Sequence, residues 1–491
     1  MPFISALLCL SLAAPAAQVA RSWSDEILYF VLVDRFADGD LSNDANVDIN
    51  GKGAFHGGDL KGLTAHLDEI ASLGATAIWV NPLVQQIPGH VDGVGFPDWG
   101  YHGYWADDFE ELDPRFGSEK DLQAFVAAAH ARGIKVLLDV VYNHAGYGSH
   151  YLTDPMTKDW LRNPALGQCG SAGDMITLCV GGGLPDFRTE RPEVAKFLLD
   201  AQLGWAKRSG VDGFRLDTLK HVDHPFWQEH RKRTRKELGK DFFLLGEVWG
   251  GDKDVLDPWF EPDEIDAGFD FGFQGSAIAF VKGRGRTVAF NRYLEKRGQV
   301  RPGHFVAHYL SDHDVDGALH QLGGDVALFR LAAILQLTTA GIPVIYYGEE
   351  VARAGGKWPD NRSDMPWGAR DILPGKGKPR DEALRRDYQK LIAIRKAHPA
   401  LSRGSHAGLF TEGDLYIFER RDPQSGDAVV VAVNRGSAAA TASVAVPSEW
   451  GAAPSIDLLD GTPMMRAGRS ISLTVAPRQA RIVSSGAPGQ R

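Results

Sequence analysis

The sequence has no surplus of basic residues and no long run of charge of one sign. Lysine and arginine together number 53 against 63 aspartates and glutamates, which leaves a net charge of −10 and a pI near 5.9. This balance argues against a nucleic-acid partner and against a polyanionic substrate. No charged stretch is long enough to serve as an interaction tail.

Signatures of several enzyme classes are also missing. The chain contains no G-x-x-x-x-G-K-[ST] phosphate loop, no G-x-S-x-G nucleophile turn and no H-E-x-x-H zinc helix. The glycine run at 181–183 does not follow a strand and open a helix, as a dinucleotide-binding loop should. Any chemistry must therefore come from other residue types.

The first twenty residues are typical of a secretory signal. An apolar run at 3–14 is followed by small residues at 13–20, although residues 1–3 carry no lysine or arginine. The run is too short to span a membrane. We predict that residues 1–20 are a signal peptide, and that the mature chain is secreted or periplasmic and not bound to a membrane.

Only three cysteines are present, and Cys9 would leave with that signal. The remaining two, Cys169 and Cys179, form a close pair that would suit a disulfide in an oxidising compartment. Two buried thiols are the alternative, and spacing alone does not decide between them.

The rest of the chain predicts a barrel. Its 491 residues, 44% of them hydrophobic, are too many for one small core and predict two or three domains. From residue 26 onward, short apolar runs alternate with helical patterns, which is typical of parallel β/α units. Strands are expected at 27–33, 75–80, 134–141, 211–216, 242–246, 268–273, 305–310 and 342–347. Helices are expected at 60–73, 119–132, 192–208, 225–238, 326–339 and 380–397. Eight strands predict a closed (β/α)₈ barrel, an α/β fold, rather than an open sheet.

Two segments depart from this alternation. A long excursion rich in Gly, Asn and Asp follows the third strand, and we predict a small inserted domain at 145–187. The barrel would then comprise 21–144 and 188–397. After it, short alternating runs at 415–419, 428–434 and 471–475 predict a C-terminal antiparallel β-sandwich domain at 398–491.

Five of the predicted strand ends carry unusual polar clusters. These clusters are Val33-Asp34-Arg35-Phe36, 139–144, 213–221, 246–249 and 309–314. In a barrel such ends converge on one face, so Asp217, Glu247 and Asp314 should share a pocket with His144, His313 and Arg215.

The pair of Arg215 and Asp217 illustrates how much depends on that convergence. Strand alternation puts both side chains on one face, and a guanidinium there keeps a carboxylate ionised. Taken alone, such a pair is more often a structural ion pair than a catalytic one. Three convergent carboxylates favour glycosidic chemistry, because two close carboxylates can divide the roles of nucleophile and proton donor.

With these motifs the sequence resembles the α-amylase family (glycoside hydrolase family 13), the retaining α-glucan-active (β/α)₈ enzymes, from about Glu26 to the C-terminal domain. The four motifs at 139–144, 213–221, 246–249 and 309–314 carry the resemblance, and 184–187 (Leu-Pro-Asp-Phe) resembles a fifth. The resemblance implies that Asp217 attacks the anomeric carbon, that Glu247 protonates the leaving oxygen and then activates water, and that Asp314 holds the distorted sugar. Asp217 and Glu247 should then have carboxyl groups roughly 5–5.5 Å apart.

The resemblance also implies a set of sugar contacts. His144 and His313 would hydrogen-bond the reacting sugar, and the ring of Tyr104, beside His102, would stack on its apolar face. Taken alone, packing roles for such residues would be about as common. The remaining expected contacts are Arg215, Lys220, His221 and Trp249.

Two positions depart from the family pattern. Asp312 stands where much of the family has Asn, a chloride ligand in some relatives, so we do not predict chloride activation. A carboxylate beside Asp314 should also raise the pKa of one of the two unless a cation or donor compensates. Phe187 stands where many relatives have Leu-Asn, which weakens assignment to a subclass.

The resemblance further implies one or two calcium sites. Asn143, Asp186 and the backbone carbonyl of His221 match a position that clamps the inserted domain against the barrel, and hard oxygen ligands suit Ca²⁺. A loop after the first strand matches a second site. Its expected ligands are Asp38, Asp40, Asn43, Asp44, Gly57 and Asp59, and a solvated acidic turn is the alternative.

We therefore expect an exported, monomeric α-amylase that cleaves internal α-1,4 bonds of starch and maltooligosaccharides, its α-glucan substrates. The alternative is a cyclomaltodextrinase, maltogenic amylase or glucanotransferase of the same family, which the first-strand loop would fit. An inactive glucan-binding relative is a third reading, which the presence of all three carboxylates disfavours.

Overall fold

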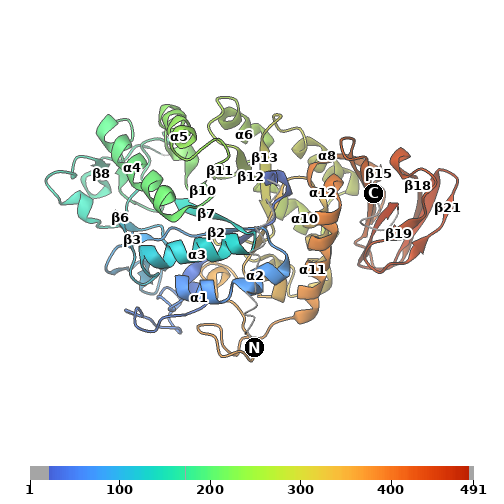
Figure 1. Ribbon diagram of the computed structural model, residues 1–491, viewed down its shortest axis with the longest axis horizontal. Helices are drawn as coiled ribbons and strands as arrows, with labels where there is room; N and C mark the ends of the chain where they lie inside the picture. The colour runs from blue at the N-terminus through green and yellow to red at the C-terminus, as the bar shows by residue number, and fades with distance from the viewer. Residues whose placement is uncertain (1–20, 172, 486–491) are drawn as a thin grey trace, which may run out of the picture.

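The computed structural model describes residues 21–171 and 173–485. Its centre is a closed barrel of parallel strands, in the neighbour order β1-β14-β13-β12-β11-β10-β7-β2 (Figure 1). These strands are β1 (Leu28–Val31), β2 (Ala77–Val80), β7 (Lys135–Val140), β10 (Gly213–Leu216), β11 (Phe243–Gly246), β12 (Ala267–Phe269), β13 (Phe305–Tyr309) and β14 (Ile342–Tyr346). The predicted eight-stranded barrel is confirmed.

The barrel strands are apolar because helices cover them on the outside and side chains fill the inside. Every residue of β1, β2, β10, β11 and β14 is buried. Register sets up the site: Leu216 of β10 pairs with Gly246 of β11. The next residues along the two strands, Asp217 and Glu247, therefore emerge side by side.

The helices of the chain are α1 (Leu60–Ala65), α2 (Leu67–Leu73), α3 (Glu119–Ala131), α4 (Pro192–Ser209), α5 (His224–Glu237), α6 (Lys253–Phe260), α7 (Gly272–Val281), α8 (Thr287–Arg297), α9 (Ala318–Gln321), α10 (Val326–Thr338), α11 (Glu382–Ala397) and α12 (Pro399–Arg403). The helix expected at 60–73 is divided into α1 and α2, because His66 leaves helical geometry with φ −111° and ψ 17°. The strand expected at 268–273 ends at Phe269, because α7 begins at Gly272.

Short 3-10 turns join these elements. They are η1 (Trp23–Asp25), η2 (Val33–Arg35), η3 (Gly100–His102), η4 (His150–Leu152), η5 (Pro164–Leu166), η6 (Leu219–His221), η7 (Glu349–Val351), η8 (Asp360–Arg362) and η9 (Ser448–Trp450). Two of them, η3 and η6, carry residues of the predicted site.

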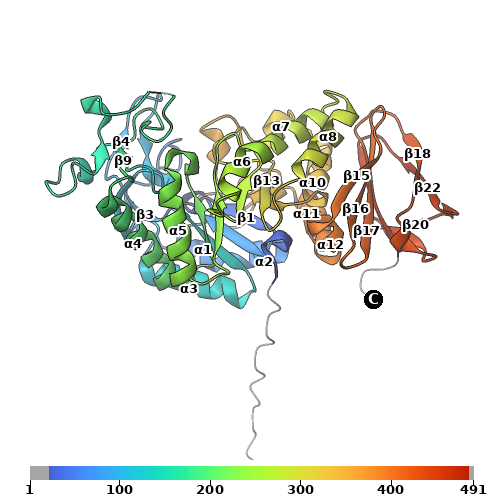
Figure 2. The ribbon, with the colours of Figure 1, turned by 90° about the horizontal axis from the view of Figure 1, so that it is seen from above.

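The chain makes two long excursions from the barrel, and Figure 2 shows β4 and β9, one strand from each, at the same end of the molecule. The first, between β2 and α3, was not predicted and contains β3 (Val84–Gln86), β4 (His90–Val91), β5 (Asp98–Trp99) and β6 (Ala106–Leu112). The second lies between β7 and α4, in the region expected as an inserted domain, and contains β8 (Leu161–Arg162) and β9 (Asp186–Phe187). The two touch, since the Gly146 N–H donates to the Ala106 carbonyl at 2.7 Å.

The second excursion also contains a disulfide between Cys169 and Cys179. Of the two alternatives that the sequence left open, the structure therefore has the bonded pair.

The C-terminal domain is a sandwich of two antiparallel sheets, drawn in red in Figure 1. One sheet has the order β15-β16-β17-β23-β19-β20 and the other β18-β22-β21. The strands are β15 (Ser405–Phe410), β16 (Leu415–Asp422), β17 (Asp427–Asn434), β18 (Ala440–Ala445), β19 (Ser455–Asp457), β20 (Pro463–Met464), β21 (Arg466–Ala467), β22 (Ser470–Val475) and β23 (Gln479–Ser485). Inward residues such as Ile417, Val430 and Leu473 form its own core.

The predicted signal peptide, residues 1–20, lies outside the described residues. Among those that the structure describes, no helix has the length and apolar character that a bilayer crossing requires.

Candidate active site

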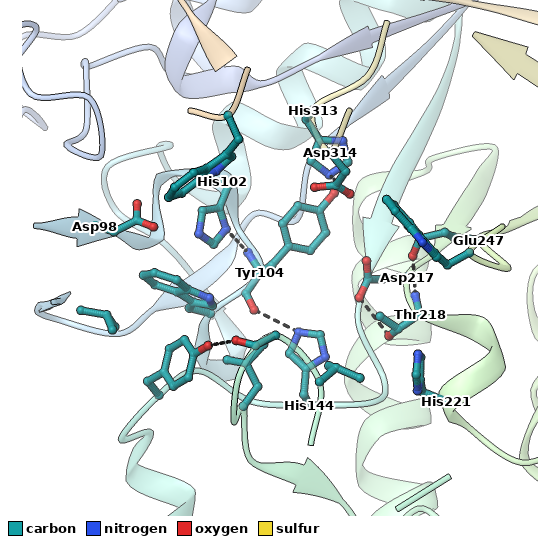
Figure 3. Close-up of a pocket in the computed structure, with 18 of the residues that line it drawn as sticks. Asp98, His102, Tyr104, His144, Asp217, Thr218, His221, Glu247, His313 and Asp314 are labelled. Atoms are coloured by element: carbon teal, nitrogen blue, oxygen red, sulfur yellow. Dashed lines mark hydrogen bonds and ion pairs between the residues drawn. The ribbon is translucent and has the colours of Figure 1, made fainter. Parts of the chain in front are cut away.

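A pocket of about 660 Å³ opens beside the carboxyl ends of the barrel strands. Asp217, Glu247 and Asp314 all line it, as the strand-end motifs predicted. Figure 3 shows these side chains around one cavity, with Asp98 at the end opposite Glu247. The convergence that distinguishes a site from isolated ion pairs is therefore present.

Asp217 and Glu247 are held by the same two neighbours. Arg215 donates from Nη1 to Asp217 Oδ1 at 2.6 Å, and its Nη2 lies 3.0 Å from Glu247 Oε1. Thr218 donates its N–H to Glu247 Oε2 at 2.8 Å and its hydroxyl to Asp217 Oδ2 at 3.0 Å. Thr218 has φ +47°, a strained conformation for a β-branched residue, and this turn aims its N–H at Glu247.

Arg215 itself lies beneath the pocket rather than in its wall. Only 1% of its surface is exposed, and its guanidinium also contacts Asp139 at 3.1 Å. The resemblance grouped Arg215 with the sugar contacts, but its hydrogen bonds go to carboxylates of the protein. It positions these carboxylates and compensates their charge in a buried site.

Glu247 has the electrostatic character of a proton donor. Burial raises its pKa to about 8, against the opposing charge of Arg215, and the carboxylates of Asp217 and Asp314 add to the increase. A carboxyl group with this pKa is protonated at neutral pH, so it can deliver a proton to a leaving oxygen.

Asp314 is held on the opposite wall by Arg362 and His313. Arg362 donates from Nη2 to Asp314 Oδ1 at 3.0 Å, and Nε2 of His313 lies 3.2 Å from Asp314 Oδ2. Burial opposes the charge of His313, but Asp314 and Asp312 on either side raise the pKa of its imidazole above the usual value.

The sequence predicted a raised pKa for Asp312 or Asp314 unless a cation or donor compensates, and the structure supplies such partners for Asp312. Its Oδ1 lies 2.9 Å from His313 Nδ1 and accepts the N–H of Asp314 at 3.0 Å. These partners outweigh burial, so the pKa of Asp312 is lowered rather than raised. The clustering of Asp312, His313 and Asp314 is thus explained by an imidazole between two carboxylates.

Tyr104 forms the floor of the pocket, and two buried histidines hold its backbone. Its hydroxyl donates to Asp139 at 2.7 Å, and its ring is parallel to that of His313, with centroids 5.2 Å apart. His102 Nδ1 accepts the Tyr104 N–H at 3.0 Å, and His144 Nε2 donates to the Tyr104 carbonyl at 3.2 Å. One face of the phenol is thus packed and fixed, which suits a stacking platform.

Lys220, His221 and Trp249 lie together beside Glu247. Lys220 donates from Nζ to the Trp249 carbonyl at 3.2 Å, and all three residues line the pocket. Trp249 is 48% exposed, unusually high for its size. These three expected sugar contacts therefore face the same pocket as Glu247.

Several lining residues were missed by the sequence reasoning. Arg362 and Trp358 lie on the long segment after β14, and Asp98 and Tyr147 lie on the two excursions. Asp98 Oδ1 is buried without a hydrogen-bond partner among the described residues, and burial raises the Asp98 pKa to about 6. None of the four follows a barrel strand directly, so no strand-end pattern marked them.

The first expected calcium position has three converging oxygens. As placed, the Asn143 side-chain oxygen faces only acceptors, the His221 carbonyl at 3.0 Å and Asp186 Oδ1 at 3.2 Å. A cation among them, or an amide rotated by 180°, would satisfy this arrangement. Arg162 donates to the other oxygen of Asp186 at 2.7 Å and leaves Oδ1 free for such a role. The ligand set fits Ca²⁺.

The loop after β1 also fits a hard cation. Side-chain oxygens of Asn43 and Asp44 are buried without donors among the described residues. Burial and the charges of Asp44 and Asp59 raise the pKa of Asp38 to about 6, which indicates uncompensated negative charge. A Cβ on Gly57 would lie 2.9 Å from Asp44 Oδ1, so that glycine brings its backbone close. The exception is Asp40, whose carboxylate turns to Ser42 and Lys61 instead.

Comparison with known proteins agrees with this geometry. The family model of the alpha amylase catalytic domain matches residues 30–163 and 179–387. The chain is 32% identical to neopullulanase 2 from Thermoactinomyces vulgaris, over 94% of this chain and 78% of that protein. It is 30% identical to a cyclomaltodextrinase from Geobacillus thermopakistaniensis, over 93% of this chain and 76% of that protein.

Among solved structures, the alpha-amylase from Geobacillus thermoleovorans complexed with acarbose superposes with a TM-score of 0.81 and 30% identity. The superposition covers 95% of this chain and all of that one. With the match to the catalytic-domain model and the three convergent carboxylates, these relations lead to one conclusion. The chain belongs to the α-amylase family and is a glycoside hydrolase.

Proposed function

We propose that the protein hydrolyses α-1,4-glucosidic bonds by double displacement with retention. Asp217 attacks the anomeric carbon while Glu247 gives its proton to the departing glycosidic oxygen. The ionised Glu247 then takes a proton from water, whose oxygen attacks the same carbon and releases Asp217. Asp314, held by Arg362 and His313, would bind the hydroxyls of the distorted sugar.

One observation carries this proposal: a single guanidinium, Arg215, contacts both Asp217 and Glu247. The two carboxyl groups are thereby kept within reach of one glycosidic bond, and the raised pKa of Glu247 suits it to the role of proton donor. Proton NMR of the first product tests it, since retention gives the α-anomer before mutarotation. A β-anomer as first product would refute the mechanism.

For the substrate, we favour cyclodextrins and short maltooligosaccharides over long starch chains. Two relatives named neopullulanase and cyclomaltodextrinase support this choice over the starch endohydrolase that the motifs alone favoured. Starch endohydrolysis is the second candidate, because the solved alpha-amylase matches this chain over its full length.

Products resolved over time on β-cyclodextrin and on soluble starch separate the two candidates. Ring opening faster than starch cleavage, with maltose and glucose as main products, is expected. Rapid loss of starch viscosity with intact cyclodextrin would instead favour the endo-acting alternative. New cyclic products would indicate a glucanotransferase.

We also propose that Ca²⁺ binds at the two oxygen clusters, one at Asn143, Asp186 and His221 and one in the loop after β1. Bound Ca²⁺ would join the excursion to the barrel and neutralise the acidic loop. Removal by EDTA should lower Tm, and added Ca²⁺ should restore it. Asp44→Asn should weaken only the loop site, so calorimetric titration should then count one site fewer.

We propose that the protein is exported to an oxidising compartment. The disulfide supports this location, because such bonds persist there. Mass spectrometry of the mature chain from separated cell fractions tests it, with a new N-terminus near residue 21 expected. The monomeric state stays a prediction, which light scattering checks.

A further inference from the structure

The loop closed by the Cys169–Cys179 disulfide lies against the active site but is weakly anchored. Of the described residues from 163 to 178, none is buried, so no apolar side chain fixes this segment to the core. Local hydrogen bonds shape it, including the Gly170 N–H to the Thr177 carbonyl at 2.8 Å. The disulfide is therefore the main constraint on the position of the loop.

A backbone atom of this loop contacts the site. The carbonyl oxygen of Met175 lies 2.9 Å from Nδ1 of His221, which lines the pocket. Immediately after the disulfide, Val180 and Gly181 line the same pocket. The loop thus both supports a pocket residue and leads directly into the pocket wall.

The contact determines which nitrogen of His221 carries hydrogen. A carbonyl only accepts hydrogen bonds, so Nδ1 must be the donor. In a neutral imidazole whose Nδ1 carries the hydrogen, the other ring nitrogen keeps a lone pair. Nε2 is then an acceptor.

We propose that the disulfide loop is a positioning element for His221, one that holds the Nδ1–H tautomer so that Nε2 accepts a hydrogen bond from a sugar hydroxyl on the leaving-group side. The side follows from the resemblance of Lys220 and His221 to the α-amylase pattern for holding sugars on the leaving-group side, and both residues line the same pocket as Glu247. This inference rests on the proposed function. Met175, Cys169 and Cys179 act through His221 and touch no reacting atom.

The test compares two substrates with wild type and the Cys169→Ser/Cys179→Ser variant. Maltohexaose places sugars on both sides of the cleaved bond, whereas p-nitrophenyl α-maltoside has a leaving group without sugar hydroxyls. The variant should raise KM for maltohexaose roughly 3- to 10-fold, the value of one hydrogen bond, and leave kcat/KM for the nitrophenyl substrate unchanged. Equal losses on both substrates would overturn the proposal.

A double-mutant cycle with His221→Ala sharpens this result. If the loop acts through His221, removing the disulfide in the His221→Ala background should add less than 2-fold to KM for maltohexaose. Independent, multiplicative effects would refute the link. Met175→Ala is the matched control: it removes a side chain but keeps the carbonyl, so KM should stay at the wild-type value.

If the serine variant does not fold, the wild type treated with dithiothreitol under native conditions replaces it. Reduction, verified by thiol titration and circular dichroism, should raise KM for maltohexaose alone. Unchanged KM in the fully reduced, folded protein would also contradict the proposal. Wild-type protein that cleaves neither substrate would refute the proposed function instead, before any substitution is made.

Discussion

The floor and the rim of the active-site pocket are built differently. The floor, which Tyr104 forms, rests on strand-end side chains that are almost completely buried, such as Arg215 and His313, each 1% exposed. The rim consists of residues on loops, such as Trp249 and Trp358, which are 48% and 40% exposed. Hydrogen bonds join the floor residues to one another, whereas the rim leaves large apolar surfaces open.

This difference separates reaction from selection. Groups that transfer protons or form bonds must be held in one geometry, and burial among charged partners both fixes them and shifts their pKa values. Groups that choose among glucans need open surface on which a sugar can stack. Substitutions in the floor should therefore change kcat, and those in the rim should change KM.

Replacing the proton donor is the most severe test of the floor. Glu247→Gln keeps the shape of the side chain but removes the proton, so kcat on maltohexaose should fall roughly 10²- to 10⁴-fold. Release of reducing sugar measures it. An unchanged rate would show that Glu247 has no chemical role. KM should change little, since the pocket surface is preserved.

Arg215→Lys removes the bridge between the two reacting carboxylates. An ammonium cannot reproduce two separate guanidinium contacts, so kcat should fall roughly 10- to 100-fold. Circular dichroism and Tm establish that the variant is folded. Lys220→Arg is the matched rim control, a basic exchange that should leave kcat near wild type. A larger kcat loss in that control would break the distinction between floor and rim.

The pH profile examines the charge of the floor directly. Because the pKa of Glu247 is raised to about 8, its acid form persists through neutral pH and is lost as the pH rises through that value. kcat/KM should therefore have an alkaline limb near pH 8 and fall about tenfold for each further unit. A limb near pH 5 would mean that burial and its carboxylate neighbours do not raise this pKa.

Trp249→Ala should have the smallest effect, confined to the rim. Loss of one stacking surface should raise KM for maltohexaose roughly 2- to 10-fold with kcat nearly constant. The nitrophenyl maltoside, with no sugar in the leaving group, is the comparison substrate. A large fall in kcat on both substrates would assign Trp249 to the floor instead.

The barrel and the three carboxylates that converge in its pocket were predictable because local patterns mark both. Apolar runs of the right length predicted all eight strands, and polar clusters at or shortly after their ends included Asp217, Glu247 and Asp314. The boundaries were less predictable: the strand expected at 268–273 ends early because a helix begins at Gly272. The residue pattern there does not show where strand β12 ends and helix α7 begins.

Two strands of the excursion between β2 and α3, β4 and β5, escaped prediction because they have two residues each, too few for a periodic pattern. Asp98 and Arg362 escaped for a related reason. Their roles depend on loops that return to the pocket from distant parts of the chain, as in the contact of Arg362 with Asp314. No local pattern encodes such a return.

The sequence alone was enough for the barrel, the three convergent carboxylates and the placement of Arg215 beside Asp217, since these follow from the apolar pattern of each strand and the polar residues at its end. Tertiary structure was needed to show that the same guanidinium reaches Glu247, that His313 compensates Asp312, and that Met175 supports His221. These contacts depend on where the folded chain places each side chain or carbonyl group. Packing of the whole fold sets them, and with them the burial and charge that shift each pKa.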